Sequence, residues 1–119
     1  MQKLKVGIIG AGRIGQVHAK SITYHIPQAE IVAISDIYVD GAKKVAADLG
    51  IPNAYKDYHE ILNNPEIEAV LICSSTDTHS TISLEAIAAG KHIFCEKPID
   101  HDVNKILEVK KALENSNVK

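Results

Sequence analysis

The chain has 119 residues, which is enough for one domain that buries about two-thirds of its unfolded surface without disulfides or a structural metal. Its residues are 45% hydrophobic, 24% charged and 4% aromatic. A net charge of -2 provides no basic field that would attract nucleic acid or an anionic membrane. No apolar run approaches the ~20 residues that a membrane span needs. Cys73 and Cys95 lie inside apolar runs, where a reduced cysteine behaves as a small hydrophobic residue. We therefore expect a cytoplasmic protein with free thiols.

The first fifteen residues predict a strand that leads into a glycine-rich turn. Residues 4–9 are apolar apart from Lys5, as in a parallel strand covered on both faces. The turn that follows has the G-x-G-x-x-G spacing, in the order Gly10, Ala11, Gly12, Arg13, Ile14 and Gly15. An amphipathic helix is predicted over residues 12–24. In this arrangement backbone N–H groups and a helix N-terminus face a pyrophosphate, so we expect a dinucleotide here.

An acidic residue closes the next predicted strand, over residues 31–36. Asp36 follows Gly15 at the spacing where a carboxylate accepts both hydroxyls of the adenosine ribose. A 2′-phosphate would meet this negative charge, and the next residue, Ile37, brings no cation. The sequence therefore favours NAD over NADP.

The rest of the chain alternates predicted helices and strands. A helix over residues 40–49, stopped by Gly50 and Pro52, precedes a short strand over residues 53–55. Asp57 and Glu60 then have capping-box spacing. Further strands are predicted over residues 69–73 and 92–95, further helices over 80–89 and 103–114, and a polar loop over 74–79.

This order predicts an α/β fold: a Rossmann doubly wound parallel sheet in the order 3-2-1-4-5. The ligand cleft is then expected at the carboxyl ends of the first and fourth strands. The hydroxyl run Ser74-Ser75-Thr76 lies at that edge and lacks the G-x-S-x-G of a nucleophile elbow, so it fits hydroxyl donors beside a cofactor. The six histidines fall on different elements without an H-E-x-x-H motif or paired cysteines, so no metal is expected.

Residues 89–98 form a specific combination with the glycine turn. Ala89-Gly90-Lys91 enters the predicted strand over 92–95, which leaves directly into Glu96-Lys97-Pro98. Together with the glycine turn, Asp36 and the polar loop ending at His79, this segment resembles the Gfo/Idh/MocA oxidoreductase family, and within it the inositol 2-dehydrogenase-like members. The resemblance covers nearly the whole chain.

The resemblance implies roles for particular residues. It implies that the cofactor is bound by Gly10, Gly12, Arg13, Ile14, Gly15, Asp36, Ser74, Ser75, Thr76, His79, Glu96 and Lys97. It also implies that Lys97 meets the substrate hydroxyl or carbonyl and assists proton transfer, while Glu96 lies near the nicotinamide. Asp77 and Thr78 depart from the Thr-Pro-Asn-like run of many members, which leaves their contacts open.

Family members run to several hundred residues, because a second α+β domain supplies the substrate cleft. We therefore expect residues 1–119 to be the NAD-binding Rossmann domain of an oxidoreductase that acts on a secondary alcohol of a sugar or cyclic polyol, with a sixth strand truncated at 117–119. Alone, it is expected to bind NAD without turnover, and the full-length enzyme is expected to be a homo-oligomer.

Two other classes of protein stay open at this point. The first is a non-catalytic, dinucleotide-sensing regulatory module, since the fold alone does not specify chemistry. Retention of Lys97 favours the enzyme over such a module. The second is a methyltransferase. Its glycine turn usually has three closely spaced glycines, and here Ile14 occupies the place of the third.

Overall fold

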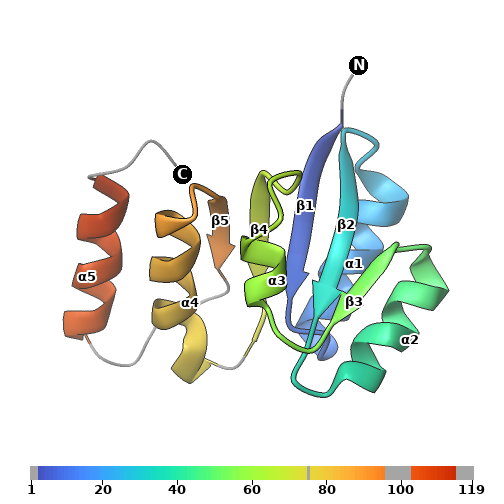
Figure 1. The fold of residues 1–119 in the computed structure, drawn as a ribbon, viewed down its shortest axis with the longest axis horizontal. Helices are drawn as coiled ribbons and strands as arrows, with labels where there is room; N and C mark the ends of the chain where they lie inside the picture. The colour runs from blue at the N-terminus through green and yellow to red at the C-terminus, as the bar shows by residue number, and fades with distance from the viewer. Residues whose placement is uncertain (1–2, 75, 96–102, 115–119) are drawn as a thin grey trace.

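The computed structural model describes residues 3–74, 76–95 and 103–114, which form a parallel sheet flanked by helices (Figure 1). The five strands are β1 (Leu4–Ile9), β2 (Ala29–Ser35), β3 (Asn53–Tyr55), β4 (Ala69–Ile72) and β5 (His92–Cys95). They lie in the order β3-β2-β1-β4-β5, and every pair is parallel. The predicted Rossmann topology is therefore confirmed, whereas the sixth strand expected at 117–119 lies outside the described residues.

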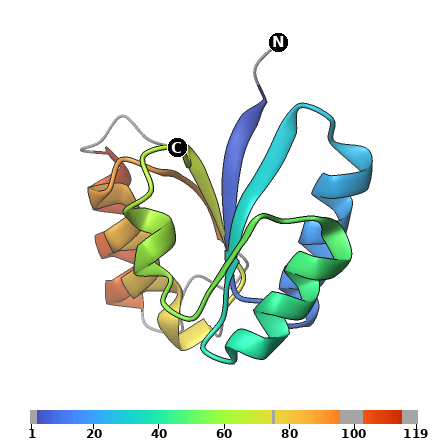
Figure 2. The same ribbon diagram turned by 45° about the vertical axis from the view of Figure 1, so that its right-hand side comes forward.

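The helices form a layer on each face of the sheet. Figure 2 shows α1 (Arg13–His25) and α2 (Val39–Leu49) on one face, and α3 (His59–Leu62), α4 (Thr76–Ala88) and α5 (Val103–Glu114) on the other. Each layer closes a core of fully buried aliphatic side chains. Ile8 and Ile34 belong to the core on the α1 side, and Ile61, Val70 and Ile72 to the core on the α3 side. Because both faces are covered, the strands carry nearly continuous apolar runs.

The predicted bounds are confirmed for β1, β3, β5 and α5, and for the left-handed Gly50 that ends α2. β2 begins two residues earlier than predicted and ends at Ser35, so Asp36 stands just beyond it. Asp57 accepts the backbone N–H of His59 rather than that of Glu60, whose N–H bonds to the Asp57 carbonyl. The capping-box prediction was therefore wrong.

The largest difference from the prediction is the start of α4. The helix begins at Thr76, four residues before the predicted start, so residues 76–79 of the predicted polar loop are helical. Serine, threonine and aspartate favour caps and turns, and a run of them conceals the point where a helix begins. The connection between β4 and α4 is consequently shorter than the predicted one.

A buried lysine joins the segment that follows α3 to the start of β5. Lys91 is 6% exposed, and its ammonium donates to the carbonyl oxygens of Asn64 (2.7 Å) and Ile67 (2.6 Å). Burial lowers the pKa of Lys91. The lysine of the Gly90-Lys91 pair thus holds the segment between α3 and β4.

Candidate functional site

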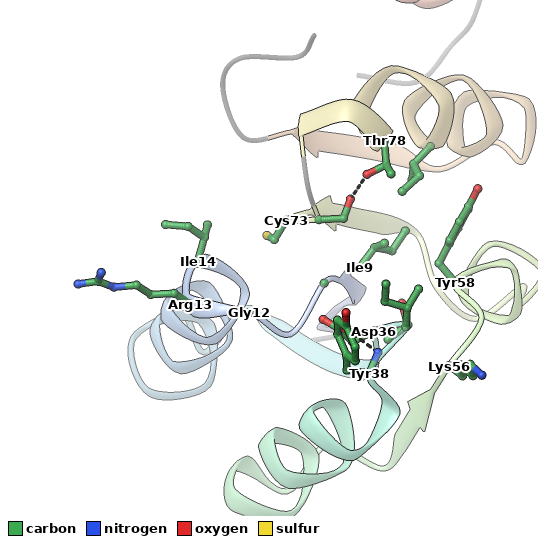
Figure 3. Close-up of a pocket in the computed structure, with 15 residues that line it drawn as sticks. Ile9, Gly12, Arg13, Ile14, Asp36, Tyr38, Lys56, Tyr58, Cys73 and Thr78 are labelled. Carbon is green, nitrogen blue, oxygen red and sulfur yellow. Dashed lines mark hydrogen bonds between the residues drawn. The ribbon is translucent and has the colours of Figure 1, made fainter. Parts of the chain in front are cut away.

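A cavity of about 520 Å³ opens at the carboxyl edge of the sheet (Figure 3). Ile9, Ser35 and Ile72 are paired at this edge and end β1, β2 and β4. Figure 3 shows Gly12, Arg13 and Ile14 on one side of the cavity and Tyr58 on the opposite side, with Asp36 between them. The cleft predicted at the ends of the first and fourth strands is therefore present.

Two glycines of the turn are required by the packing of the protein itself. Gly10 has a φ of 108°, and a Cβ there would lie 2.6 Å from the carbonyl carbon of Cys73. A Cβ on Gly15 would lie 1.9 Å from the carbonyl oxygen of Gly10. The first glycine lets β4 approach the turn, and the third lets α1 pack onto it.

Gly12 differs from both of these glycines. Its φ of -76° is open to any residue, and a Cβ there would meet no heavy atom within 4 Å. Gly12 also lines the cavity. Since the described protein does not need a glycine here, the space that a side chain would fill is left to the cavity.

The N-terminus of α1 faces the same space. Gly12 is its N-cap, no side chain caps it, and its first turn holds no acidic residue. The positive end of the helix dipole and the first N–H groups are therefore available to an anion, such as a diphosphate. The Arg13 side chain extends away from the cavity in Figure 3.

Asp36 joins the turn to the end of β2. One carboxylate oxygen accepts the backbone N–H of Ala11 (2.7 Å), and the other accepts that of Tyr38 (2.8 Å). Asp36 and Tyr38 both line the cavity. A carboxylate has about four lone-pair positions, so these two bonds leave two positions for further donors.

The connection from β4 to α4 lines the cavity through Ser74 and Thr78, whose hydroxyl oxygens lie 2.7 Å apart. His79 is 2% exposed, and its Nε2 donates to the Ser74 carbonyl (2.7 Å). The structure thus places His79 behind the wall, holding the chain at Ser74. Among the predicted site residues, Ser75, Glu96 and Lys97 and the side chain of Thr76 lie outside what the structure describes.

The side chain of Tyr58 completes the wall opposite the glycine turn. Its phenol donates to Glu85 Oε1 on α4 (2.5 Å). Burial, followed by this hydrogen bond, raises the pKa of Tyr58. The phenol therefore stays neutral and acts as a hydrogen-bond donor.

Comparison with protein-family models matches residues 4–119 to the Gfo/Idh/MocA family, described as an oxidoreductase family with an NAD-binding Rossmann fold. The chain belongs to this family. The family and the Rossmann fold predicted from the sequence are thus both confirmed.

Relatives of the Gfo/Idh/MocA domain include inositol dehydrogenases. This chain is 43% identical to a myo-inositol 2-dehydrogenase of Thermotoga maritima over 113 residues, which cover 92% of the chain. Over 97 residues, covering 81% of this chain, it is 45% identical to an inositol 2-dehydrogenase of Azotobacter vinelandii. The chain covers 34% and 29% of these two proteins, so it spans about a third of the length of the curated relatives it matches.

Solved structures give the same result. A scyllo-inositol dehydrogenase from Lactobacillus casei, with bound NAD(H) and scyllo-inositol, matches with a TM-score of 0.94 at 30% identity. This match covers 99% of the present domain and 35% of the L. casei chain. Of the residues described here, no group of three or more His, Cys, Asp or Glu could hold a metal ion, and no helix could cross a bilayer.

The sequence did not single out several residues that line the site of this domain. These are Ser35, Tyr38, Lys56, Tyr58 and Ile82. Two further lining residues were named without a cofactor role: Ile37, noted only for bringing no cation, and Thr78, whose contacts were left open. Position at a strand end could have found Lys56 and Tyr58, because they follow β3 and the ends of parallel strands meet at one edge. An earlier helix start could have found Thr78 and Ile82, which lie four residues apart on α4.

Proposed function

We propose that this chain is the nucleotide-binding part of an NAD-dependent, inositol-dehydrogenase-like oxidoreductase. The observation that carries the proposal is Gly12, whose missing side chain is explained by no protein contact and whose place is at the N-terminus of α1. The names of the relatives support a cyclic polyol with a secondary alcohol as the substrate.

Different residues of the cavity would bind different parts of the cofactor. The N–H groups at the start of α1 and the open space at Gly12 suit the diphosphate. The two remaining acceptor positions of Asp36 suit the two hydroxyls of the adenosine ribose, which favours NAD over NADP. When bound, NAD supplies the nicotinamide that accepts a hydride from the alcohol carbon.

Lys97 is proposed to handle the proton of the substrate hydroxyl. It follows β5, which ends at Cys95, and Cys95 is paired with Ile72 at the edge where the cavity opens. A lysine amine beside the substrate would donate a hydrogen bond to the substrate oxygen or accept its proton. The full-length protein is proposed to be a homo-oligomer, with its substrate cleft completed beyond these 119 residues.

Calorimetric titration of Gly12→Val with NAD tests the observation at Gly12. The valine would occupy the diphosphate space, so we expect binding to fall at least roughly 100-fold with the fold retained. Gly41→Val is the matched control, because a Cβ on Gly41 also meets no heavy atom within 4 Å but lies on α2 outside the cavity lining. Equal affinities of the two variants would refute the site.

Turnover provides a separate test. Because the chain spans about a third of its relatives, NAD and myo-inositol are expected to give no NADH with this chain alone. NADH formation would show that the substrate groups lie within these 119 residues. Absence of NAD binding to the unsubstituted chain would instead favour neither the enzyme nor the sensing module.

A further inference from the structure

Three ionisable side chains connect the wall of the cavity to α3 and α4. His59 Nδ1 lies 2.7 Å from Asp57 Oδ1, and His59 Nε2 lies 2.5 Å from Glu85 Oε2. The other oxygen of Glu85 accepts the phenol of Tyr58. The rings of Tyr58 and His59 are stacked, with centroids 4.2 Å apart. Glu85 is therefore shared between a histidine and the residue that lines the cavity.

The geometry requires a doubly protonated imidazole. Each ring nitrogen of His59 faces a carboxylate oxygen, and a carboxylate can only accept a hydrogen bond. A neutral imidazole has one N–H, so its other nitrogen would direct a lone pair at one of the carboxylates. Both contacts are favourable together only when His59 carries a positive charge.

The surrounding charges act in the same direction. The groups that face His59 in the described structure are Asp57 before α3, the adjacent Tyr58 and Glu85 on α4. Hydrogen bonds to Asp57 and then to Glu85 raise the pKa of His59, against a smaller effect of burial. The pKa of Asp57 is lowered, chiefly by the backbone N–H of His59.

We propose that protonated His59 and Glu85 are positioning residues for the cofactor cavity, holding Tyr58 as the wall opposite the glycine turn, so that NAD affinity depends on the protonation of His59. The proposal rests on the proposed function, since it assumes that NAD occupies this cavity. It concerns affinity, because Glu85 and His59 act through Tyr58.

Loss of the proton would loosen the wall in a defined order. The Asp57 contact is local and is the largest cause of the raised pKa of His59, so we expect the neutral ring to keep its proton on Nδ1. The Glu85 contact joins segments 26 residues apart and is the one that is lost. Glu85 then keeps only its bond with the phenol, so Tyr58, which also packs against the core on the α3 side, is held less firmly beside the bound nucleotide.

The test is the NAD dissociation constant measured from about pH 6 to about pH 9, through the range where a histidine with a raised pKa titrates. For the unsubstituted chain we expect affinity to fall roughly three- to tenfold as the pH rises, with its midpoint at the His59 pKa measured by NMR. In His59→Gln the side chain at position 59 cannot titrate, so NAD affinity is expected to stay constant over this pH range. Tyr58→Phe is expected to be flat as well, although its His59 still titrates.

His25→Gln is the matched control, because His25 is an exposed histidine in the last turn of α1 and should leave the step unchanged. A flat profile in the unsubstituted chain would overturn the inference, as would a step that persists in His59→Gln. Circular dichroism of each variant confirms folding. Failure of the proposed function is distinguishable, because it would abolish NAD binding at every pH, including the pH at which the cluster is intact.

Discussion

The two walls of the cavity, the glycine turn and the side of Tyr58, are held in place by different interactions. On the glycine-turn side, the main chain is fixed by close packing, since there is no room for a Cβ at Gly10 or Gly15. On the opposite side, the position of Tyr58 depends on hydrogen bonds among ionisable side chains that are partly exposed. The glycine-turn wall is set by steric exclusion alone, whereas the Tyr58 wall combines packing against the core with hydrogen bonds between charged groups.

This difference separates what fixes binding from what adjusts it. Packed backbone has one arrangement and does not respond to pH or salt. Exposed ion pairs contribute little to stability, are screened by salt and respond to protonation. The glycine-turn wall is therefore expected to decide whether a dinucleotide binds, and the Tyr58 wall how tightly it binds under given conditions.

Substitution of Gly15 should have the largest effect. A methyl group in Gly15→Ala would lie 1.9 Å from the Gly10 carbonyl oxygen, forcing α1 away from the turn. We expect the free energy of unfolding to fall by about 3 kcal/mol, measured by urea denaturation. Gly41→Ala, in open space on α2, should instead stabilise the chain by up to about 1 kcal/mol. Similar stabilities for the two variants would contradict the steric description.

Removal of the Asp36 carboxylate tests the link between the turn and β2. Asp36→Ala leaves the N–H groups of Ala11 and Tyr38 without this acceptor and removes the proposed ribose contact. NAD affinity should fall roughly 30-fold, or about 2 kcal/mol, and the preference over NADP should relax. Asp40→Ala, at an exposed site in the first turn of α2, serves as the control. An unchanged NAD-to-NADP ratio in calorimetry would contradict the role of Asp36.

The Tyr58 wall should respond less. Tyr58→Phe keeps the ring and loses the hydrogen bond to Glu85, which should lower the free energy of unfolding by about 1 kcal/mol. Tyr24→Phe, at a residue on α1 that is 65% exposed, should change the free energy of unfolding by less than about 0.5 kcal/mol. Chemical denaturation of both variants provides the comparison, and a larger loss in Tyr24→Phe would reverse it.

The smallest expected effect is the pH dependence of stability. The raised pKa of His59 means that its contribution is complete below the pKa of the unfolded state, about 6.5, and is lost as the pH rises through the folded value. The stability difference between the unsubstituted chain and His59→Gln should therefore shrink from about pH 6 to about pH 9. The effect is small because the His59 side chain is 50% exposed. A difference that grows with pH would have the wrong sign.

The sheet was predictable because its strands carry local signals. Continuous apolar runs marked β1, β4 and β5, and the order of elements then specified the topology. The start of α4 was not predictable in the same way, since Thr76, Asp77 and Thr78 suit a loop as well as a first helical turn. Its position depends on packing of Ile82 and Ala86 against the sheet.

The site was predictable only where spacing along the chain determines it. The glycine turn and Asp36 follow from such spacing, but the bonds from Asp36 to Ala11 and Tyr38 depend on how the turn closes. Tyr58 and Glu85 are 27 residues apart and meet only because α3 and α4 lie on the same face. No local pattern encodes that contact.

The buried ammonium of Lys91 makes one segment chemically distinct. Its amine is enclosed by the carbonyls of Asn64 and Ile67, whereas the other described lysines are less buried. An acylating reagent can reach Lys91 only when the segment between α3 and β4 opens. The rate at which Lys91 is acylated, relative to exposed lysines such as Lys43, therefore reports how often this part of the native protein opens without global unfolding.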